Sequence, residues 1–330
     1  MSEAMRILVP ILARLVLPCL LLPVTAMAEG TPADPASLTL RDGFDGADFS
    51  PEGGLYYREN YEQSAGRVEF ESQVVRAGAG ALRLSVRPLC KPNSEGCSER
   101  AEIWEKTELR VPYDEGVWYG LSMRFDDTPP QNDHRYVVMQ WKREINPDAE
   151  GDFSPFLALR LRLGVAFATV ETNFIAPPAD APRPEAGTCP AGWSPVWLRP
   201  ETRQMRVLVA AAPDWTPEVT SDFDHCTDAV VTEGPAILPV AEGAWHDYVF
   251  YTRPGPTGDG LIHIAVDGAP VVRIHGHIGH GDQGLGKNQY FKFGPYRDAG
   301  EGDWTMYYDS FARAPDCAAV LSDAVCAALE

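Results

Sequence analysis

The chain consists of short apolar or alternating runs separated by glycine, proline, asparagine and aspartate. Alternation sends successive side chains to opposite faces of a strand, and only the tail from 317 to 329 has a convincing helical period. The pattern therefore predicts an antiparallel all-β protein, a sandwich of two packed sheets of jelly-roll type. The predicted strands cover residues 66–75, 81–86, 118–125, 136–141, 156–163, 165–171, 205–211, 245–252, 261–266, 271–275, 290–294 and 304–311.

The clearest turn signal is Asp267-Gly268, which separates two of these runs. Both positions of a tight hairpin turn must tolerate positive φ, so a hairpin is predicted here. The segment from about 175 to 200 is dense in proline and contains Cys189, which indicates a long surface excursion and not more sheet.

The first 28 residues have the pattern of a secretory signal, with a basic start, an apolar run and small residues at a cleavage site. We predict a signal peptide over 1–28, a single domain over 29–330, and a periplasmic or extracellular location. Cys19 leaves a lipid anchor as an alternative, although the small residues expected directly before a lipidated cysteine are absent. No later stretch approaches the roughly 20 apolar residues that cross a bilayer, so no membrane span is expected.

Export also affects the interpretation of the cysteines. Six of the seven lie beyond residue 28, and an oxidising compartment favours disulfides. Six cysteines allow about 15 pairings. Proximity in the sequence predicts the pairs Cys90–Cys97, Cys189–Cys226 and Cys317–Cys326, of which the last closes a C-terminal tail over about 315–330.

The formal net charge of the chain is −19. A protein this acidic is not expected to coat nucleic acid. It can still bind an anionic substrate, because a local group of arginines and lysines makes a cleft positive while the rest of the surface stays acidic.

The strand near residue 293 carries the strongest chemical signal. Alternation predicts that Tyr290, Lys292 and Tyr296 share one face, whereas Phe291 and Phe293 take the other. A cation beside a tyrosine hydroxyl favours the phenolate and lowers a pKa that is ordinarily about 10. Such a pair can move protons near an anionic substrate. The alternative interpretation is an ordinary edge strand with exposed lysine and tyrosine.

Two further predicted strands carry polar side chains at alternate positions. On the first, Arg100 and Glu102 share a face. Solvent exposure explains any one of these strands alone, but three polar faces in one sandwich predict a lined groove. On the second strand, the residues predicted to share a face are His134, Tyr136, Gln140 and Lys142.

The three motifs, in this order, resemble those of the jelly-roll polysaccharide lyases with a concanavalin-like fold, in particular the heparin lyase I-like group, and also glucuronan and alginate lyases. They stand here as Arg100-Ala101-Glu102, Gln140-Trp141-Lys142 and the run from Tyr290 to Tyr296. The resemblance spans roughly residues 40–314. It implies a secreted lyase that cleaves a uronic-acid-containing anionic polysaccharide by β-elimination.

The resemblance also implies roles for individual residues. β-Elimination needs a clamp that neutralises the uronate carboxylate, a base for the C5 proton and an acid for the leaving oxygen. Arg100 and Gln140 fit the clamp, and Tyr296 matches the family's catalytic tyrosine. With Lys142, these are the catalytic candidates. The candidate substrate-binding residues are Lys292, Tyr290, His134, Tyr136, Glu102, Arg297 and His277.

Lys142 departs from the family pattern, which usually has histidine at this position. A lysine must lose about three pKa units before it serves as a base near neutrality. Lys142 with a lowered pKa, Tyr296 acting as both base and acid, and a replacement by His134 or a histidine of 275–280 remain open. We favour Tyr296 for both transfers. A catalytically inactive binder is a fourth alternative.

The histidine cluster at 275–280 also permits a metal site, closed by His280 or Asp282. We favour a substrate-covering loop and expect no metal and no cofactor. Calcium accompanies some relatives, but no oxygen-rich loop here has a recognisable ligand spacing. We also expect the protein to be a monomer.

Two other functions compete with elimination. A glycoside hydrolase needs two carboxylates across the scissile bond, but Glu102 and Glu105 should face opposite ways on a strand. A noncatalytic lectin-like protein would use Trp104, Trp141 and Tyr136 as stacking platforms. The few cations expected in the cleft favour a polymer with carboxylates over a heavily sulfated one; these cations are Arg100, Lys142, Lys292 and Arg297.

Overall fold

The computed structural model describes residues 39–46, 56–58, 64–91, 96–126, 128–151, 153–216, 222–281 and 284–329. All of them belong to one compact unit that begins at Asp34. The predicted signal peptide, Cys19 and Asp282 lie outside the described residues. None of the helices in the described ranges is long and apolar enough to cross a membrane.

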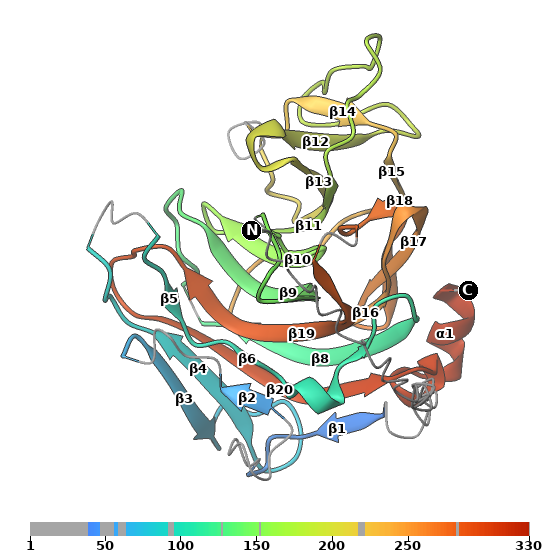
Figure 1. The fold of residues 1–330 in the computed structure, drawn as a ribbon. Coiled ribbons are helices and arrows are strands. Elements are labelled where there is room, and N and C mark those ends of the chain that lie inside the picture. Colours follow the sequence, from blue (N-terminus) through green and yellow to red (C-terminus); the bar gives the residue numbers. More distant parts are fainter. Residues whose placement is uncertain are drawn as a thin grey trace, which may run out of the picture. The chain divides into compact units, whose positions relative to one another are not determined.

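The predicted antiparallel jelly-roll β-sandwich is confirmed, with two curved sheets stacked on each other (Figure 1). The nine-stranded sheet runs in the order β15 (Val230–Glu233), β18 (Ala269–Ile278), β17 (Gly255–Val266), β16 (Trp245–Arg253), β8 (Val117–Phe125), β20 (Trp304–Ala314), β4 (Ala81–Val86) and β3 (Gly66–Glu71), and β1 (Leu40–Asp42) pairs with β20. The eleven-stranded sheet runs in the order β14 (His225–Thr227), β12 (Ser194–Arg199), β13 (Gln204–Ala211), β11 (Val165–Asn173), β10 (Leu157–Arg162), β9 (Tyr136–Ile145), β19 (Leu285–Arg297), β6 (Ile103–Glu105) and β2 (Tyr56–Arg58), with β5 (Glu99–Arg100) and β7 (Val111–Pro112) also on β19.

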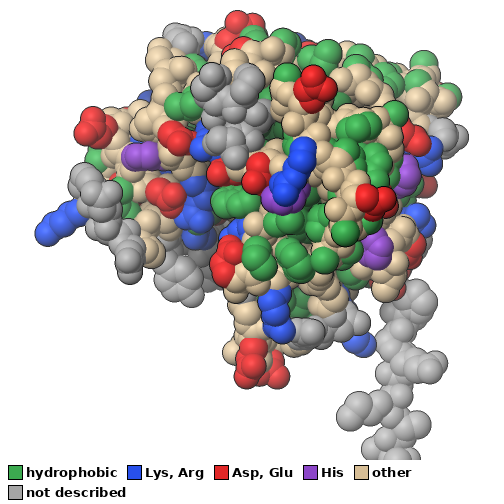
Figure 2. Space-filling view, turned by 90° about the horizontal axis from the view of Figure 1, so that it is seen from above, with side chains coloured by type: hydrophobic (Ala, Val, Ile, Leu, Met, Phe, Trp, Pro, Cys, Tyr) green, Lys and Arg blue, Asp and Glu red, His purple; other side chains and the backbone are tan. Residues whose placement is uncertain are grey.

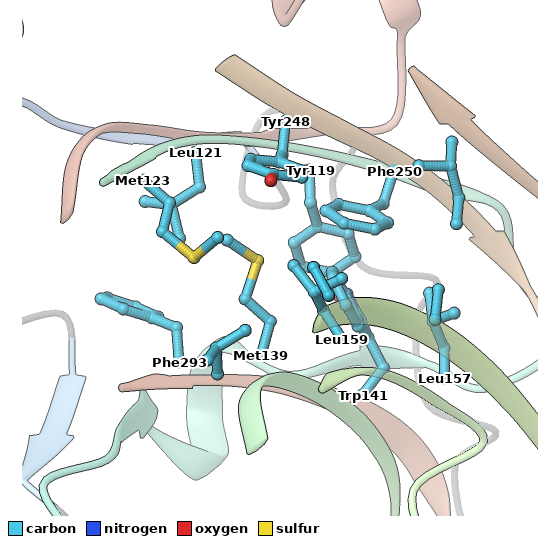
Figure 3. Close-up of a cluster of buried hydrophobic side chains, with 14 of the residues drawn as sticks. Tyr119, Leu121, Met123, Met139, Trp141, Leu157, Leu159, Tyr248, Phe250 and Phe293 are labelled. Atoms are coloured by element: carbon cyan, nitrogen blue, oxygen red, sulfur yellow. The ribbon is translucent and has the colours of Figure 1, made fainter. Parts of the chain in front are cut away.

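Aromatic and aliphatic side chains fill the space between the sheets (Figure 3). The Trp141 ring of β9 lies 4.5 Å from that of Phe291 on β19 and 4.4 Å from that of Phe250 on β16, measured between ring centres. Because neighbouring side chains on a strand point to opposite faces, this packing turns the residues on either side of Trp141 and Phe291 outward. The buried face of β9 and β19 thus determines which side chains reach the outer surface.

A bulge on β9 interrupts the alternation. Against β10, Met139 pairs with Leu159 and Val137 with Arg160, so Val138 is an extra residue between the two pairs. A bulge re-aims the side chains that follow it. On the N-terminal side of the bulge, Val137 faces outward and Tyr136 turns into the core.

Gly294 on β19 lies where the chain passes close to the link between β5 and β6. Its φ is +125°, and a Cβ atom there would lie 2.2 Å from the Ala101 carbonyl oxygen. Only glycine fits this contact, which brings β19 against Arg100. Tyr296 then pairs with Arg100 in register.

The predicted hairpin is confirmed, because Asp267 and Gly268 have φ of 52° and 76° in the turn between β17 and β18. The expectation of no further sheet in the proline-rich excursion is wrong for its last part. There β12 pairs with β13 on one side and with β14 on the other, so its backbone polar groups are satisfied within the sheet.

All three expected disulfides are present, namely Cys90–Cys97, Cys189–Cys226 and Cys317–Cys326. The last one closes the tail, whose helix α1 (Asp323–Leu329) packs Leu329 near Trp118 and Ala265, on the outer side of the nine-stranded sheet. The opposite side of the molecule, the outer face of the eleven-stranded sheet, carries the candidate site.

Candidate active site

Polar side chains of β6, β9 and β19 meet on the outer face of the eleven-stranded sheet. Lys292 of β19 pairs in register with Trp104 of β6 and with Gln140 of β9. Its Nζ atom lies 3.9 Å from the centre of the Trp104 ring, and the Tyr290 ring lies 5.5 Å from that ring. Tyr290 and Lys292 therefore share this face, as alternation predicts.

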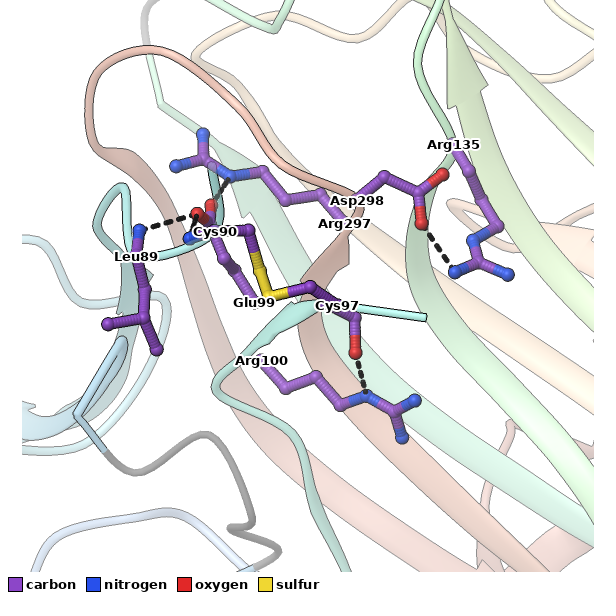
Figure 4. The surroundings of a disulfide bond; sticks show 9 residues. Leu89, Cys90, Cys97, Glu99, Arg100, Arg135, Arg297 and Asp298 are labelled. Carbon is purple, nitrogen blue, oxygen red and sulfur yellow. Dashed lines mark hydrogen bonds and ion pairs between the residues drawn. A yellow bond between two sulfur atoms is a disulfide. The ribbon is translucent and has the colours of Figure 1, made fainter. Parts of the chain in front are cut away.

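Tyr296, near the end of β19, packs against two guanidinium groups. The guanidinium carbon of Arg100 lies 4.0 Å from the centre of the Tyr296 ring, and that of Arg135 lies 4.8 Å away. Arg135 is held by an ion pair with Asp298, which lies two residues after Tyr296 in the sequence (Figure 4). Negative charge that develops on the Tyr296 oxygen is therefore close to two cations, which attract it.

Glu102 connects the predicted carboxylate clamp. The Gln140 Nε2 group donates a hydrogen bond to Glu102 Oε1, and Glu102 Oε2 lies 3.8 Å from an Arg100 terminal nitrogen. Glu102 is completely buried, whereas Arg100 is partly exposed. Glu102 therefore orients the amide and the guanidinium from below and does not contact solvent itself.

Lys142 lies two residues beyond Gln140 on β9 and pairs in register with Tyr290. Its side chain is partly buried on the same outer face. The structure thus brings Arg100, Gln140 and Lys142 together with Tyr296 along one surface, within three neighbouring strands.

The structure does not place Tyr136 on this surface. The bulge at Val138 turns its side chain into the core, where its ring packs edge-on against Trp304 at 5.0 Å. The ring of Tyr136 is therefore not a platform beside Tyr296, but Tyr136 also lines a pocket next to this surface, and substrate binding by Tyr136 stays a prediction.

Arg297 also lies away from this surface. It is buried on the core side, and its Nε donates a 2.6 Å hydrogen bond to Glu99 (Figure 4). Strict alternation after Tyr296 sends Arg297 inward, where Glu99 supplies the partner that a buried cation requires. This buried position does not support the predicted substrate-binding role of Arg297.

The histidines occupy separate places. His134 is exposed beside Arg135 on the outer face of the eleven-stranded sheet. His277 is on β18 of the nine-stranded sheet, and its Nδ1 lies 2.9 Å from the Pro256 carbonyl oxygen. His275 is near Glu233, at 3.4 Å. The structure does not bring His277 to the face that carries Tyr296.

Potential metal ligands are dispersed in the same way. In the ranges that the structure describes, no three or more histidine, cysteine, aspartate or glutamate side chains are grouped to hold a metal ion. His280, one of the predicted candidates, is buried with its Nε2 3.1 Å from the Ser154 carbonyl oxygen.

Sequence reasoning missed a pocket of about 310 Å³ that adjoins Tyr296 on the outer face. We call it the arginine pocket. It extends over β10, β11, β13 and β12, and the only sequence signal for it is the alternation of arginine with leucine along β10. The arginine pocket is lined by Arg135, Arg160, Arg162, Arg199 and Arg206, by Trp197, Phe167 and Phe223, and by His134, Asp133 and Asp222, with Tyr136 and Leu161.

Three of the guanidiniums that line the arginine pocket share one fully buried carboxylate, that of Glu171. Glu171 Oε1 accepts hydrogen bonds of 2.9 Å from Arg160 and 2.8 Å from Arg206, and Oε2 accepts one of 3.3 Å from Arg199. Burial of Glu171 acts to raise its pKa, but Arg206, Arg160 and Arg199 outweigh that effect and lower the pKa to about 2. Glu171 is therefore ionised at neutral pH.

The outer face thus holds more cations than the sequence analysis expected. Arg297 is absent from it, but five arginines line the arginine pocket. Seen from above this sheet, Lys and Arg side chains are interspersed with acidic ones, so the surplus of acid does not form a single patch on this face (Figure 2). The number of cations on this face therefore does not favour a polymer with carboxylates over a sulfated one.

Comparisons with known proteins identify the family and the fold. A model of the polysaccharide lyase family, described as "Polysaccharide lyase", matches residues 48–312. The fold is similar to that of an endo-β-1,4-glucuronan lyase from the fungus Trichoderma reesei, with 16% identity, a TM-score of 0.54, and coverage of 86% of this chain and 96% of that one. No curated protein matches the chain.

Two further solved structures are more distant. The alginate lyase A1-II′, a member of polysaccharide lyase family 7, has 11% identity and a TM-score of 0.39, with 74% of this chain and 84% of that chain covered. The cellulose-induced protein Cip1 has 12% identity and a TM-score of 0.45, with 84% and 97% covered. Because the family model spans most of its length, this chain belongs to the polysaccharide lyase family and is a polysaccharide lyase.

Proposed function

We propose that this lyase acts in the periplasm or outside the cell on an anionic polymer that contains uronic acid, and that it cleaves by β-elimination. The observation that carries the proposal is the common surface of Arg100, Gln140 and Tyr296. The order of the three motifs supports a relation to the heparin lyase I-like group. Three disulfides support an oxidising compartment.

Arg100 and Gln140 bind the carboxylate of the uronate that reacts. A guanidinium donates to two oxygens, and the Gln140 amide has a second N–H beyond the one that Glu102 accepts. Positive charge and hydrogen bonds on the carboxylate stabilise the carbanion-like charge that forms when the C5 proton leaves. In this proposal Arg100 supplies the positive charge that neutralises the carboxylate, and no metal ion is assigned to that role.

Tyr296 transfers the proton. As a phenolate it removes the proton from C5, the C4–O bond then breaks as the C4–C5 double bond forms, and the phenol returns the proton to the departing glycosidic oxygen. Arg100 and Arg135 stabilise the phenolate charge. Lys142 binds a carboxylate of the polymer and takes no part in proton transfer.

The proposal is tested by mixing the purified protein with glucuronan, alginate and heparin in turn. Elimination creates an unsaturated product that absorbs in the ultraviolet, whereas hydrolysis and binding do not. We expect absorbance to rise with at least one uronate polymer, and we expect Tyr296→Phe to lose nearly all of this activity because it lacks the ionisable oxygen.

The matched control is Tyr251→Phe, the same chemical change on the nine-stranded sheet, where the Tyr251 ring packs against Trp118. This variant should keep wild-type turnover, and circular dichroism should show that both variants fold. Activity like that of the wild type in Tyr296→Phe would overturn the mechanism.

A further inference from the structure

We infer that the arginine pocket is a second anion-binding subsite of the lyase, which holds the carboxylate of another uronate in the same polymer chain. The inference rests on the proposed function, because it assigns the reacting uronate to Tyr296. It adds a place for the polymer beyond the reacting sugar.

The arginine pocket is continuous with the surface around Tyr296. Arg135 both lines the pocket and packs on the Tyr296 ring. Val137 pairs in register with Tyr296 on one side and with Arg160 on the other, so Arg160 lies two strands from Tyr296. Two strand spacings are about 10 Å, so a single oligosaccharide can occupy both places.

The charges around Glu171 do not balance. Arg160, Arg199 and Arg206 all surround its single carboxylate, which stays ionised, so this group carries two positive charges in excess. Arg162 with Asp133 and Asp222 carries one negative charge in excess, so the two groups together remain positive. Arg160 is almost fully buried, and Arg199 and Arg206 are mostly buried. Holding several guanidiniums away from water is costly unless anions accompany them, and one further carboxylate would offset part of the excess.

The walls of the arginine pocket suit a sugar ring. Trp197 is partly exposed, and the guanidinium carbons of Arg199 and Arg206 lie 5.3 Å and 5.1 Å from the centre of its ring. At the rim Arg162 is held by Asp133 and Asp222. An aromatic wall with a few charged groups in a volume of about 310 Å³ is typical of small-ligand sites.

The test measures binding of hexaglucuronate to the Tyr296→Phe protein by calorimetry, so that no turnover interferes. We expect Arg206→Gln to weaken binding about tenfold, as the loss of one charge-assisted hydrogen bond does, and Arg206→Lys to recover part of that loss. Trp197→Ala should weaken binding as well, which covers the case in which Arg206→Gln does not fold. Arg273→Gln, at an exposed arginine of the nine-stranded sheet, is the control and should bind like its parent.

Cellohexaose is the matched neutral probe, and it should bind at least tenfold more weakly than hexaglucuronate. Equal binding of the two, or unchanged hexaglucuronate affinity in folded Arg206→Gln and Trp197→Ala, would overturn the inference. If the wild type cleaves no uronate polymer while hexaglucuronate still binds through Arg206 and Trp197, the proposed function fails and the subsite stands. If polymers are cleaved but these variants bind normally, the subsite alone fails.

Discussion

Buried carboxylates on the two faces of the eleven-stranded sheet have different surroundings. On the core side, Glu105 accepts a 2.6 Å hydrogen bond from one guanidinium, that of Arg313. Burial raises the pKa of Glu105, and Arg313 only partly offsets this effect. On the outer side, Glu171 has three guanidinium partners, and its pKa falls to about 2 despite burial.

The comparison separates two uses of buried charge. A single carboxylate with a single guanidinium is neutral as a pair and needs no further ion, so it serves the fold. A carboxylate with three guanidiniums keeps a positive excess that attracts an anion from outside. Glu99 with Arg297 belongs to the first kind, which explains why Arg297 has no place in the site.

The largest loss of stability is expected when the Glu105–Arg313 ion pair of the core is broken. Arg313→Met leaves the Glu105 carboxylate buried without its guanidinium and should lower the free energy of unfolding by about 3 to 5 kcal/mol. Denaturant unfolding at neutral pH measures the loss. The double variant Glu105→Gln, Arg313→Met removes both charges and should regain much of it; a double variant as unstable as the single one would contradict the neutral-pair interpretation.

The second largest loss of stability is expected at low pH, where Glu171 becomes protonated. Its pKa is about 2 in the folded protein against an ordinary value of 4.5, so its contribution to stability is complete above about pH 4.5 and is lost as the pH falls toward 2. The loss over this window should be about 3 kcal/mol. Urea unfolding over a pH series measures it. Glu171→Gln lacks this group, so parallel curves for the variant and the wild type would exclude Glu171 as the source.

Removing one outer guanidinium should cost much less than removing Arg313. Arg199→Gln leaves Glu171 with Arg160 and Arg206, so the free energy of unfolding should fall by only about 1 kcal/mol. The same denaturant experiment measures it. A loss as large as that of Arg313→Met would mean that the three guanidiniums are all needed for the fold, and the distinction between the two faces would disappear.

The smallest effect on stability is expected at Lys142, which lies on the outer face near Tyr296. Lys142→Ala should leave the unfolding free energy within about 0.5 kcal/mol of the wild type and raise KM about fivefold, since it removes one contact to an anionic polymer. Steady-state kinetics on a cleaved uronate polymer measures KM and kcat separately. A collapse of kcat with unchanged KM would make Lys142 the base.

Much of the fold followed from alternation, because a period of two is visible in β8, β9, β16 and β19 and one face of each strand is apolar. The same rule placed Tyr290, Lys292 and Tyr296 correctly. It failed at Tyr136, because a bulge leaves no trace in the residue types around Val138. It also failed for β12, where flanking prolines outweighed the alternation of Ser194 to Arg199.

The arginine pocket could not be predicted from the sequence, for a different reason. Arg160 on β10 matches the pattern of a solvent-facing position, and nothing near it in the sequence reveals Glu171 on β11 or Arg206 on β13. The cluster exists only because three strands pair in a particular register. Contacts between residues far apart in the sequence cannot be predicted from a local pattern.

The Cys189–Cys226 bond ties the proline-rich excursion to β14, the edge strand beside β12. Trp197 and Arg199, two walls of the arginine pocket, are on β12. Reduction of this bond would remove the covalent tie between the excursion and β14, and strand pairing would then hold β14 on β12. On the inferred subsite, this bond stiffens one side of the place where the polymer would lie, and we expect the oxidised protein to bind a uronate oligomer more tightly than the reduced one.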